Sequence, residues 1–118
     1  MSKVTIWHNP RCSKSREALS ILEESANEKE VFKYLDTTPS KQEILDTLKM
    51  LGFSSAREWM RTKEEIYKEL ALESVTDEDA LVTAMLNNPK LIERPVLIKN
   101  NKAIIGRPTS IIAAFLKA

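Results

Sequence analysis

The sequence predicts an α/β fold built on one mixed sheet of four strands, and three observations lead to that prediction. The first third of the chain reads as strand, helix and strand, because the spacing of its apolar residues switches from alternation to a helical period. The middle third holds four helix-start patterns in succession. The last third returns to two short apolar runs and ends on an amphipathic segment. A sheet that begins with a parallel pair and ends with an antiparallel pair accommodates this order.

The first third predicts a parallel strand–helix–strand unit. Residues 4–7 form the first strand, with Val4 and Ile6 on one face, and residues 31–35 form the second. Residues 13–25 form the helix between them. The apolar residues on one side of that helix are Ala18, Leu19, Ile21, Leu22 and Ala26. A helix that joins two neighbouring parallel strands predicts a right-handed crossover.

Capping patterns predict several short helices between residues 40 and 89. Ser40 with Glu43 forms a capping box, and Gly52 stands where a glycine commonly ends a helix. Three similar patterns follow, the last in a weaker form: Ser55 with Glu58, Thr62 with Glu65, and Thr76 with Asp79. Residues 87–89, Asn-Asn-Pro, are expected to end the last of these helices.

The end of the chain predicts a hairpin and a closing helix. Residues 96–98 and 103–105 flank Asn100 and Asn101, and asparagine tolerates the positive φ of a tight hairpin turn. Residues 110–117 form the closing helix. At 118 residues the chain is too short for two well-buried cores. We therefore predict one domain, 1–118, with a helical insertion at about 40–89.

Composition excludes several functional classes. A hydrophobic fraction of 42% with 30% charged residues is typical of a folded globular protein and argues against an intrinsically disordered one. A net charge of +1 gives no general excess of cations for nucleic-acid phosphates. One cysteine and one histidine cannot supply a usual zinc site. No apolar run approaches the ~20 residues that span a membrane, and the N-terminus lacks a signal core, so we expect a cytoplasmic location.

Cys12 is the candidate nucleophile. It lies where the first predicted strand gives way to the helix, and the unpaired N–H groups of a first helical turn favour a thiolate or another anion. Arg11, Lys14 and Arg16 add positive charge nearby, and His8 can add more when protonated or can move a proton. A free cysteine is more often a small buried apolar residue, but the polar surroundings here favour a reactive one.

Spacing around Cys12 excludes two other thiol chemistries. A tyrosine-phosphatase loop needs an arginine where this chain has Ala18, and a thioredoxin-type dithiol needs a cysteine where it has Ser15. If Cys12 is oxidised during turnover, the resolving thiol must therefore come from another molecule. Glutathione is the obvious supplier in a reducing compartment.

Two Arg-Pro dipeptides provide candidate oxyanion ligands. Arg94-Pro95 precedes a predicted strand and Arg107-Pro108 follows another. Proline restricts the residue before it, and the planar guanidinium suits bidentate contact with an oxyanion. A solvated surface charge is the alternative for either arginine, and sequence spacing does not place either beside Cys12.

These motifs together resemble the glutaredoxin-dependent arsenate reductases of bacteria, in their short form. The resemblance spans essentially the whole chain and rests on the segment 8–16 (HNPRCSKSR), Arg61, the segment 93–95 (ERP) and the segment 106–108 (GRP). It implies a thioredoxin-like fold with the helical insertion between the second and third strands. It also implies that Pro95 is a cis-proline that faces the cysteine.

The resemblance further implies a division of roles. Cys12 attacks the arsenic of arsenate, His8 helps to keep Cys12 ionised, and three arginines hold the oxyanion: Arg61, Arg94 and Arg107. Glutathione then attacks the Cys12–arsenic adduct, glutaredoxin reduces the resulting intermediate, and arsenite leaves. The protein needs no metal, flavin or nicotinamide of its own.

Two related readings remain open. One is a glutathione-linked thiol or disulfide reductase that acts on another substrate, since one fold serves many reactions. The other is a redox-linked transcription regulator that binds RNA polymerase. Such regulators usually carry a Cys-x-x-Cys pair, and Ser15 stands in place of the second cysteine here.

Overall fold

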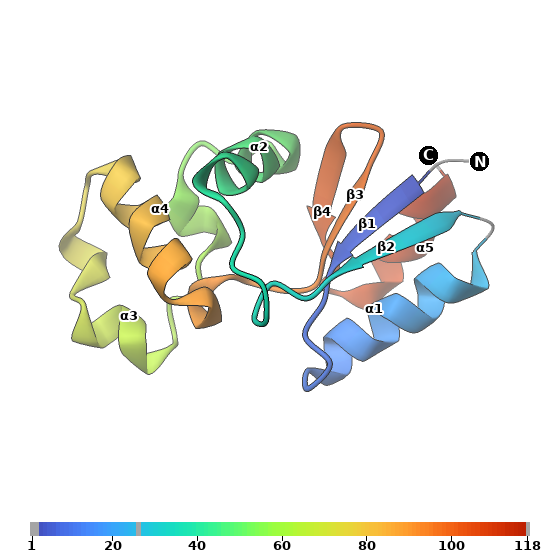
Figure 1. Ribbon diagram of the computed structural model, residues 1–118, viewed down its shortest axis with the longest axis horizontal. Coiled ribbons are helices and arrows are strands. Elements are labelled where there is room, and N and C mark those ends of the chain that lie inside the picture. Colours follow the sequence, from blue (N-terminus) through green and yellow to red (C-terminus); the bar gives the residue numbers. More distant parts are fainter. Residues whose placement is uncertain (1–2, 26, 118) are drawn as a thin grey trace. The chain divides into compact units, whose positions relative to one another are not determined.

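A computed structural model describes residues 3–25 and 27–117 of the chain (Figure 1). Residues 1–2 and 118 of the predicted domain, and Ala26 of the predicted helix face, lie outside the described residues. The strands are β1 (Lys3–Trp7), β2 (Glu28–Phe32), β3 (Val96–Lys99) and β4 (Lys102–Ile105). The α-helices are α1 (Ser13–Glu24), α2 (Lys41–Leu51), α3 (Glu65–Glu69), α4 (Glu78–Asn87) and α5 (Ile112–Lys117). This order confirms the predicted α/β fold and places α2, α3 and α4 between the second and third strands.

The sheet is mixed, as predicted, with strand order β2-β1-β3-β4. The first strand pairs parallel with β2 and antiparallel with β3, so that Ile6 lies opposite both Val31 and Leu97. The β3–β4 hairpin turns at Asn100 and Asn101, whose φ angles are 52° and 62°. Two successive residues with positive φ match the right-handed twist of the strands that they join, which explains why asparagines stand there.

The described residues divide into two compact units, which we describe separately. The sheet unit contains residues up to 37 and from 94 onward, and the helical unit contains residues 38–93. The helical unit corresponds to the predicted insertion. Whether the whole chain acts as one domain stays a prediction.

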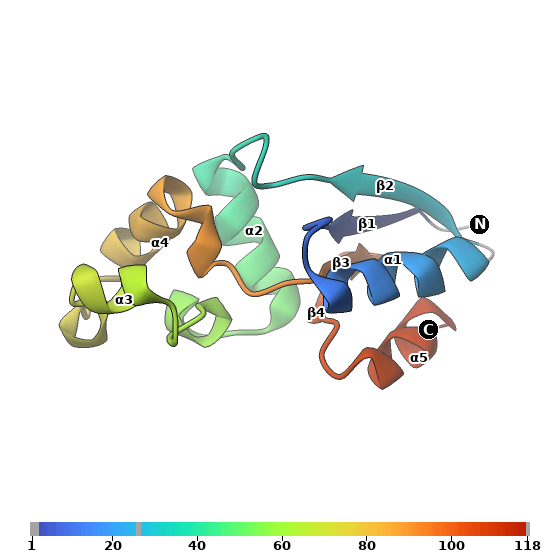
Figure 2. The same cartoon turned by 90° about the horizontal axis from the view of Figure 1, so that it is seen from below.

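The core of the sheet unit lies between the sheet and the pair α1 and α5, which cover the same face (Figure 2). The residues that form it are Val4, Ile6, Ala18, Leu22, Leu97, Ile112 and Leu116. Gly106 follows β4, where a Cβ atom would come within 2.9 Å of the Ile112 side chain and 3.1 Å of Leu97. A side chain at position 106 would therefore disturb the packing of α5 on the sheet.

Capping patterns located the start of α2 correctly, but they misplaced other boundaries. Ser40 Oγ accepts from the Glu43 N–H and Glu43 Oε1 accepts from the Ser40 N–H, at 3.1 and 2.9 Å. Gly52, with φ of 76°, ends that helix as predicted. The Ser55 box begins only a 3₁₀ turn, Ala56–Trp59.

Four expectations on element starts were wrong. The third helix begins after Glu64 and not after Thr62, and α4 is capped by Asp77 and not by Thr76. The closing helix α5 starts at Ile112, after a 3₁₀ turn over Thr109–Ile111. The second strand lies three residues earlier than predicted. Its first three residues, Glu28, Lys29 and Glu30, are charged and exposed, so pairing with β1 forms this edge strand where apolar alternation gives no signal.

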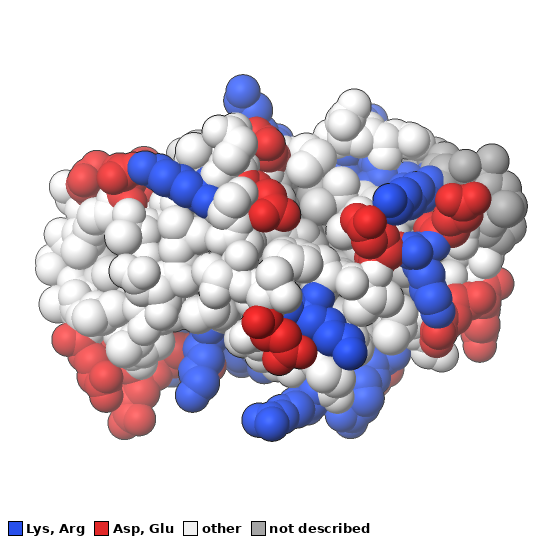
Figure 3. Space-filling model, viewed as in Figure 1, with Lys and Arg blue, Asp and Glu red and all other residues white. Residues whose placement is uncertain are grey.

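Charged side chains cover much of the surface. On the face shown in Figure 3, basic and acidic side chains are interspersed. In the sheet unit, Lys3 pairs with Glu30 at 3.0 Å, and Lys29 pairs with Glu23. Within residues 3–25 and 27–117, no helix has the length and apolar character needed to cross a membrane.

Candidate active site

Cys12 occupies the N-cap position of α1, at the junction where the sequence predicted it. Its backbone is extended (φ −96°, ψ 123°), and its carbonyl accepts the Arg16 N–H at 3.0 Å. The thiol makes no capping hydrogen bond to the helix and is partly exposed. Because first-turn N–H groups have no intrahelical partner, this end of the helix carries partial positive charge beside the sulfur.

The loop that precedes Cys12 is fixed by hydrogen bonds centred on Asn9. Its carbonyl accepts from the Cys12 N–H at 3.0 Å, and its side-chain Oδ1 accepts from the Arg11 N–H at 3.0 Å. The Asn9 N–H itself donates to Ser15 Oγ at 3.0 Å. The loop is thus tied both to itself and to the first turn of α1, so the backbone of Cys12 is held in place.

His8 is buried and lies 2.7 Å from Ser15, between His8 Nδ1 and Ser15 Oγ. Burial, and then the positive charge of Lys33, lower the pKa of His8 below its ordinary value of 6.5. At neutral pH the imidazole ring is therefore mostly uncharged, and its hydrogen-bond partner is Ser15. In the sequence, Ser15 is notable only because it stands where a Cys-x-x-Cys motif would have its second cysteine. The structure shows it as a fully buried link between the histidine and the cysteine loop.

Arg107 is the arginine that contacts the thiol. Its Nη2 donates to Cys12 Sγ at 3.5 Å, across 95 positions of sequence. Its Nε donates to the carbonyl of Arg94 at 2.7 Å, which orients the guanidinium. The Arg94 backbone therefore belongs to the same network, and the Arg94 side chain is partly buried.

The two Arg-Pro dipeptides are alike in geometry and lie side by side. The Arg94–Pro95 and Arg107–Pro108 peptide bonds are both cis. The Gly106 N–H donates to the Pro95 carbonyl at 2.8 Å and so joins the two segments. The resemblance implied a cis bond at Pro95, whereas nothing in the sequence indicated one at Pro108.

Arg61 belongs to the helical unit. Its N–H donates to the Leu91 carbonyl at 2.7 Å, beside a two-residue antiparallel bridge between Met60 and Ile92. A cavity of about 400 Å³ lies around its side chain. The residues that line this cavity are Met60, Arg61, Thr62, Lys63, Glu64 and Glu93. The role of Arg61 in an oxyanion site with Cys12 stays a prediction.

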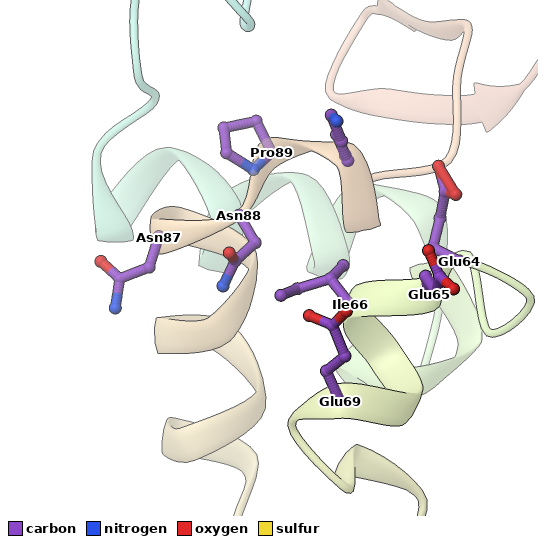
Figure 4. A pocket seen from close by; sticks show the side chains of 8 residues that line it. Glu64, Glu65, Ile66, Glu69, Asn87, Asn88 and Pro89 are labelled. Atoms are coloured by element: carbon purple, nitrogen blue, oxygen red, sulfur yellow. The ribbon is translucent and has the colours of Figure 1, made fainter.

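A second cavity of the helical unit has a different character. It measures about 510 Å³ and lies between the start of α3 and the end of α4 (Figure 4). Glu65 and Glu69 line it on one side, and Asn87, Asn88 and Pro89 on the other. It contains neither a thiol nor a guanidinium. Across the part of the chain that the structure describes, no three His, Cys, Asp or Glu side chains gather so as to hold a metal ion.

Comparison with known proteins places this arrangement in a family. The sequence pattern of the ArsC family matches residues 7–115, from the end of β1 to α5. The chain belongs to the ArsC family. It is 50% identical over 117 residues to an arsenate reductase of Neisseria meningitidis, covering 98% of this chain and 100% of the relative. It is also 55% identical over 107 residues to the uncharacterized protein YfgD of Escherichia coli, covering 90% of each.

Solved ArsC structures share the fold. The structure of an arsenate reductase from Vibrio cholerae superposes with a TM-score of 0.91 at 46% identity, covering 96% of this chain and 97% of that one. The thioredoxin-like fold that the sequence motifs implied is thereby confirmed, together with the position of the insertion. Cys12, Arg94, Arg107 and Arg61 all lie within the matched residues.

Proposed function

We propose that this protein reduces arsenate to arsenite with glutathione and glutaredoxin as the source of electrons. The observation that carries the proposal is the contact between Cys12 Sγ and Arg107 Nη2 at the N-terminus of α1. A thiol held against a guanidinium and a helix N-terminus is suited to attack an anion that would otherwise repel a thiolate. Membership of the ArsC family and the arsenate reductases among its relatives support this substrate.

In the first proposed step, the Cys12 thiolate attacks arsenic(V). A sulfur–arsenic bond forms, one arsenic–oxygen bond breaks, and the oxygen leaves as water after it takes up protons. Arg107 and Arg94 hold the remaining oxygens, and the free N–H groups of the first turn of α1 offer further donors. The family resemblance assigns Arg61 to the same oxyanion.

In the second step, the glutathione thiolate attacks the arsenic of the Cys12–arsenic adduct, a second sulfur–arsenic bond forms, and another oxygen leaves as water. A glutaredoxin thiolate then attacks the glutathione sulfur, a disulfide forms between glutaredoxin and glutathione, and the electron pair of the broken sulfur–arsenic bond reduces arsenic to its trivalent state. Water finally cleaves the remaining Cys12–arsenic bond, so that arsenite leaves and Cys12 returns as a thiol. Because Ser15 stands where a second cysteine would be needed, the chain offers no resolving thiol of its own.

A coupled assay tests this proposal. We expect arsenate-dependent consumption of NADPH when the protein is mixed with glutathione, glutaredoxin and glutathione reductase. The rate should fall to background when glutaredoxin is omitted and when Cys12→Ser replaces the wild type. A background rate with the wild type would overturn the proposal. A rate that appears only with glutathione conjugates or mixed disulfides, and not with arsenate, would instead favour a general thiol reductase.

A further inference from the structure

Two carboxylates face the guanidinium of Arg61. Its Nη1 donates to Glu64 Oε1 at 3.3 Å, and its Nε lies 3.7 Å from Glu93 Oε1. All three side chains are about equally exposed, at 28%, 32% and 28% for Arg61, Glu64 and Glu93. The group is therefore neither sealed in the core nor fully solvated, so its charges act on anything that enters the cavity.

Hydrogen bonds to the backbone hold the chain at the two glutamates, which belong to separate segments. The Glu93 N–H donates to the Trp59 carbonyl at 3.1 Å, and the Trp59 indole N–H donates to the Glu93 carbonyl at 3.1 Å. The Glu64 N–H donates to the Arg61 carbonyl at 3.1 Å, where Glu64 serves as N-cap of α3. The backbone at each glutamate is thus held by contacts other than the ion pair with Arg61.

The charges of this cavity balance. Arg61 and Lys63 supply two positive charges, and Glu64 and Glu93 supply two negative ones. Orienting an arginine does not require two carboxylates. Arg57, in the same unit, is held by three uncharged acceptors: the Tyr67 hydroxyl, the Leu72 carbonyl and the Val75 carbonyl. The second carboxylate at Arg61 therefore has an effect beyond orientation, because it offsets positive charge that would otherwise attract any anion.

We propose that Glu64 and Glu93 are positioning residues for Arg61 that also weaken its hold on tetrahedral oxyanions. This inference rests on the proposed function, in which Arg61 binds the oxyanion. Phosphate and sulfate share the shape of arsenate, and tight binding of any of them before the reaction does not lower the barrier of the chemical step. A balanced cavity orients donors toward the anion yet lets an unreactive one leave.

Equilibrium binding of inorganic phosphate to the full chain tests the inference. Glu93→Gln and Glu64→Gln each remove one negative charge while keeping a side chain that can accept from Arg61. We expect each variant to bind phosphate about three- to tenfold more tightly than the wild type in titration calorimetry, and less so as salt is raised. Glu65→Gln changes the net charge equally but lies outside this cavity, so it should leave phosphate affinity unchanged.

Two further variants separate this effect from a structural one. Glu93→Asp keeps the charge and should restore affinity close to that of the wild type. In an Arg61→Ala background, the gain from Glu93→Gln should fall to about twofold or less, because the remaining attraction comes from Lys63 alone. Thermal unfolding shows which variants are folded, and the Glu64 and Glu93 variants act as independent replicates.

Kinetics distinguish failure of this inference from failure of the proposed reaction. With active protein, Glu93→Gln should lower the KM for arsenate and the Ki for phosphate together, without raising kcat. Unchanged or weaker phosphate binding by both glutamine variants, or no phosphate binding by any protein tested, would overturn the inference. If the wild type reduces no arsenate yet the Arg61-dependent gain in phosphate affinity is present, the reaction is wrong and the role of the two carboxylates stands.

Discussion

The sheet unit and the helical unit hold their arginines in different ways. In the sheet unit, Arg107 donates to the thiol of Cys12 and is oriented by the backbone carbonyl of Arg94. In the helical unit, the guanidinium of Arg61 faces two carboxylates, and the guanidinium of Arg57 donates to uncharged acceptors. Arg107 thus contacts the candidate nucleophile, whereas Arg61 and Arg57 contact acceptors within their own unit, so we expect their removal to have different consequences.

Arg107→Ala should have the largest effect on activity among the variants that compare the two units. Loss of the guanidinium removes the donor beside Cys12 Sγ and, in the proposed reaction, a donor to the oxyanion, so kcat/KM for arsenate should fall by about 10²- to 10³-fold. Arg107 is exposed, so the free energy of unfolding should change by less than about 1 kcal/mol. The coupled assay and urea unfolding measure the two quantities, and unfolding of the variant would show that the arginine is structural.

Arg57→Ala is the matched change in the helical unit, and it should lower stability while leaving activity little changed. Its removal leaves the carbonyls of Leu72 and Val75 and the hydroxyl of Tyr67 without this donor. We expect a loss of about 2–3 kcal/mol in the free energy of unfolding, with kcat/KM for arsenate little changed in the folded protein. A large fall in kcat/KM with unchanged stability would contradict the assignment of this arginine to support.

Ser15→Ala should give a smaller effect on the sheet unit. The change leaves the buried Asn9 N–H and His8 Nδ1 without their partner, which loosens the loop that sets the position of Cys12. We expect kcat/KM to fall about tenfold, mainly through kcat, and the rate of Cys12 alkylation to fall with it. Ser20→Ala, on the exposed side of α1, is the control that should alter neither.

Sequence periodicity was sufficient for the order of the elements, but long-range contacts decided the site. The alternation around Val4 and Ile6 and the asparagines at 100 and 101 are local signals, and the elements that they predicted are present. The contact between Cys12 and Arg107 depends on which strands pair, so no local pattern reveals it.

The carboxylates at Arg61 show the same limit in the helical unit. The sequence pattern singled out Glu93 only as the residue before an Arg-Pro dipeptide, and it gave no signal at Glu64. Glu93 meets Arg61 because an isolated bridge joins Met60 to Ile92, and a bridge of one residue pair has no periodicity to detect. Glu64 meets Arg61 locally, three residues along the chain. The capping pattern predicted that α3 starts after Thr62, whereas the N-cap is Glu64.

Acidification should give the smallest effect, a loss of unfolding free energy that begins at a different pH in each unit. The pKa of His8 is lowered in the folded protein, chiefly by burial, so the unfolded chain binds a proton more readily as pH falls below 6.5. The stability that His8 contributes is therefore complete above pH 6.5 and is lost as pH falls through its folded pKa. Glu58, in the helical unit, has its pKa lowered chiefly by the Ser55 and Ser54 N–H groups. Its contribution is present above pH 4.5 and is lost only in more acidic solution.

The two windows can be resolved by measuring unfolding free energy across pH in the wild type, His8→Gln and Glu58→Gln. The histidine variant should lose the part of the pH dependence that begins just below pH 6.5, and the glutamate variant the part that begins below pH 4.5. Glu58 is fully exposed, so its window should be the shallower one. If His8→Gln retains the full slope between neutrality and pH 5, burial of a neutral imidazole does not govern that slope.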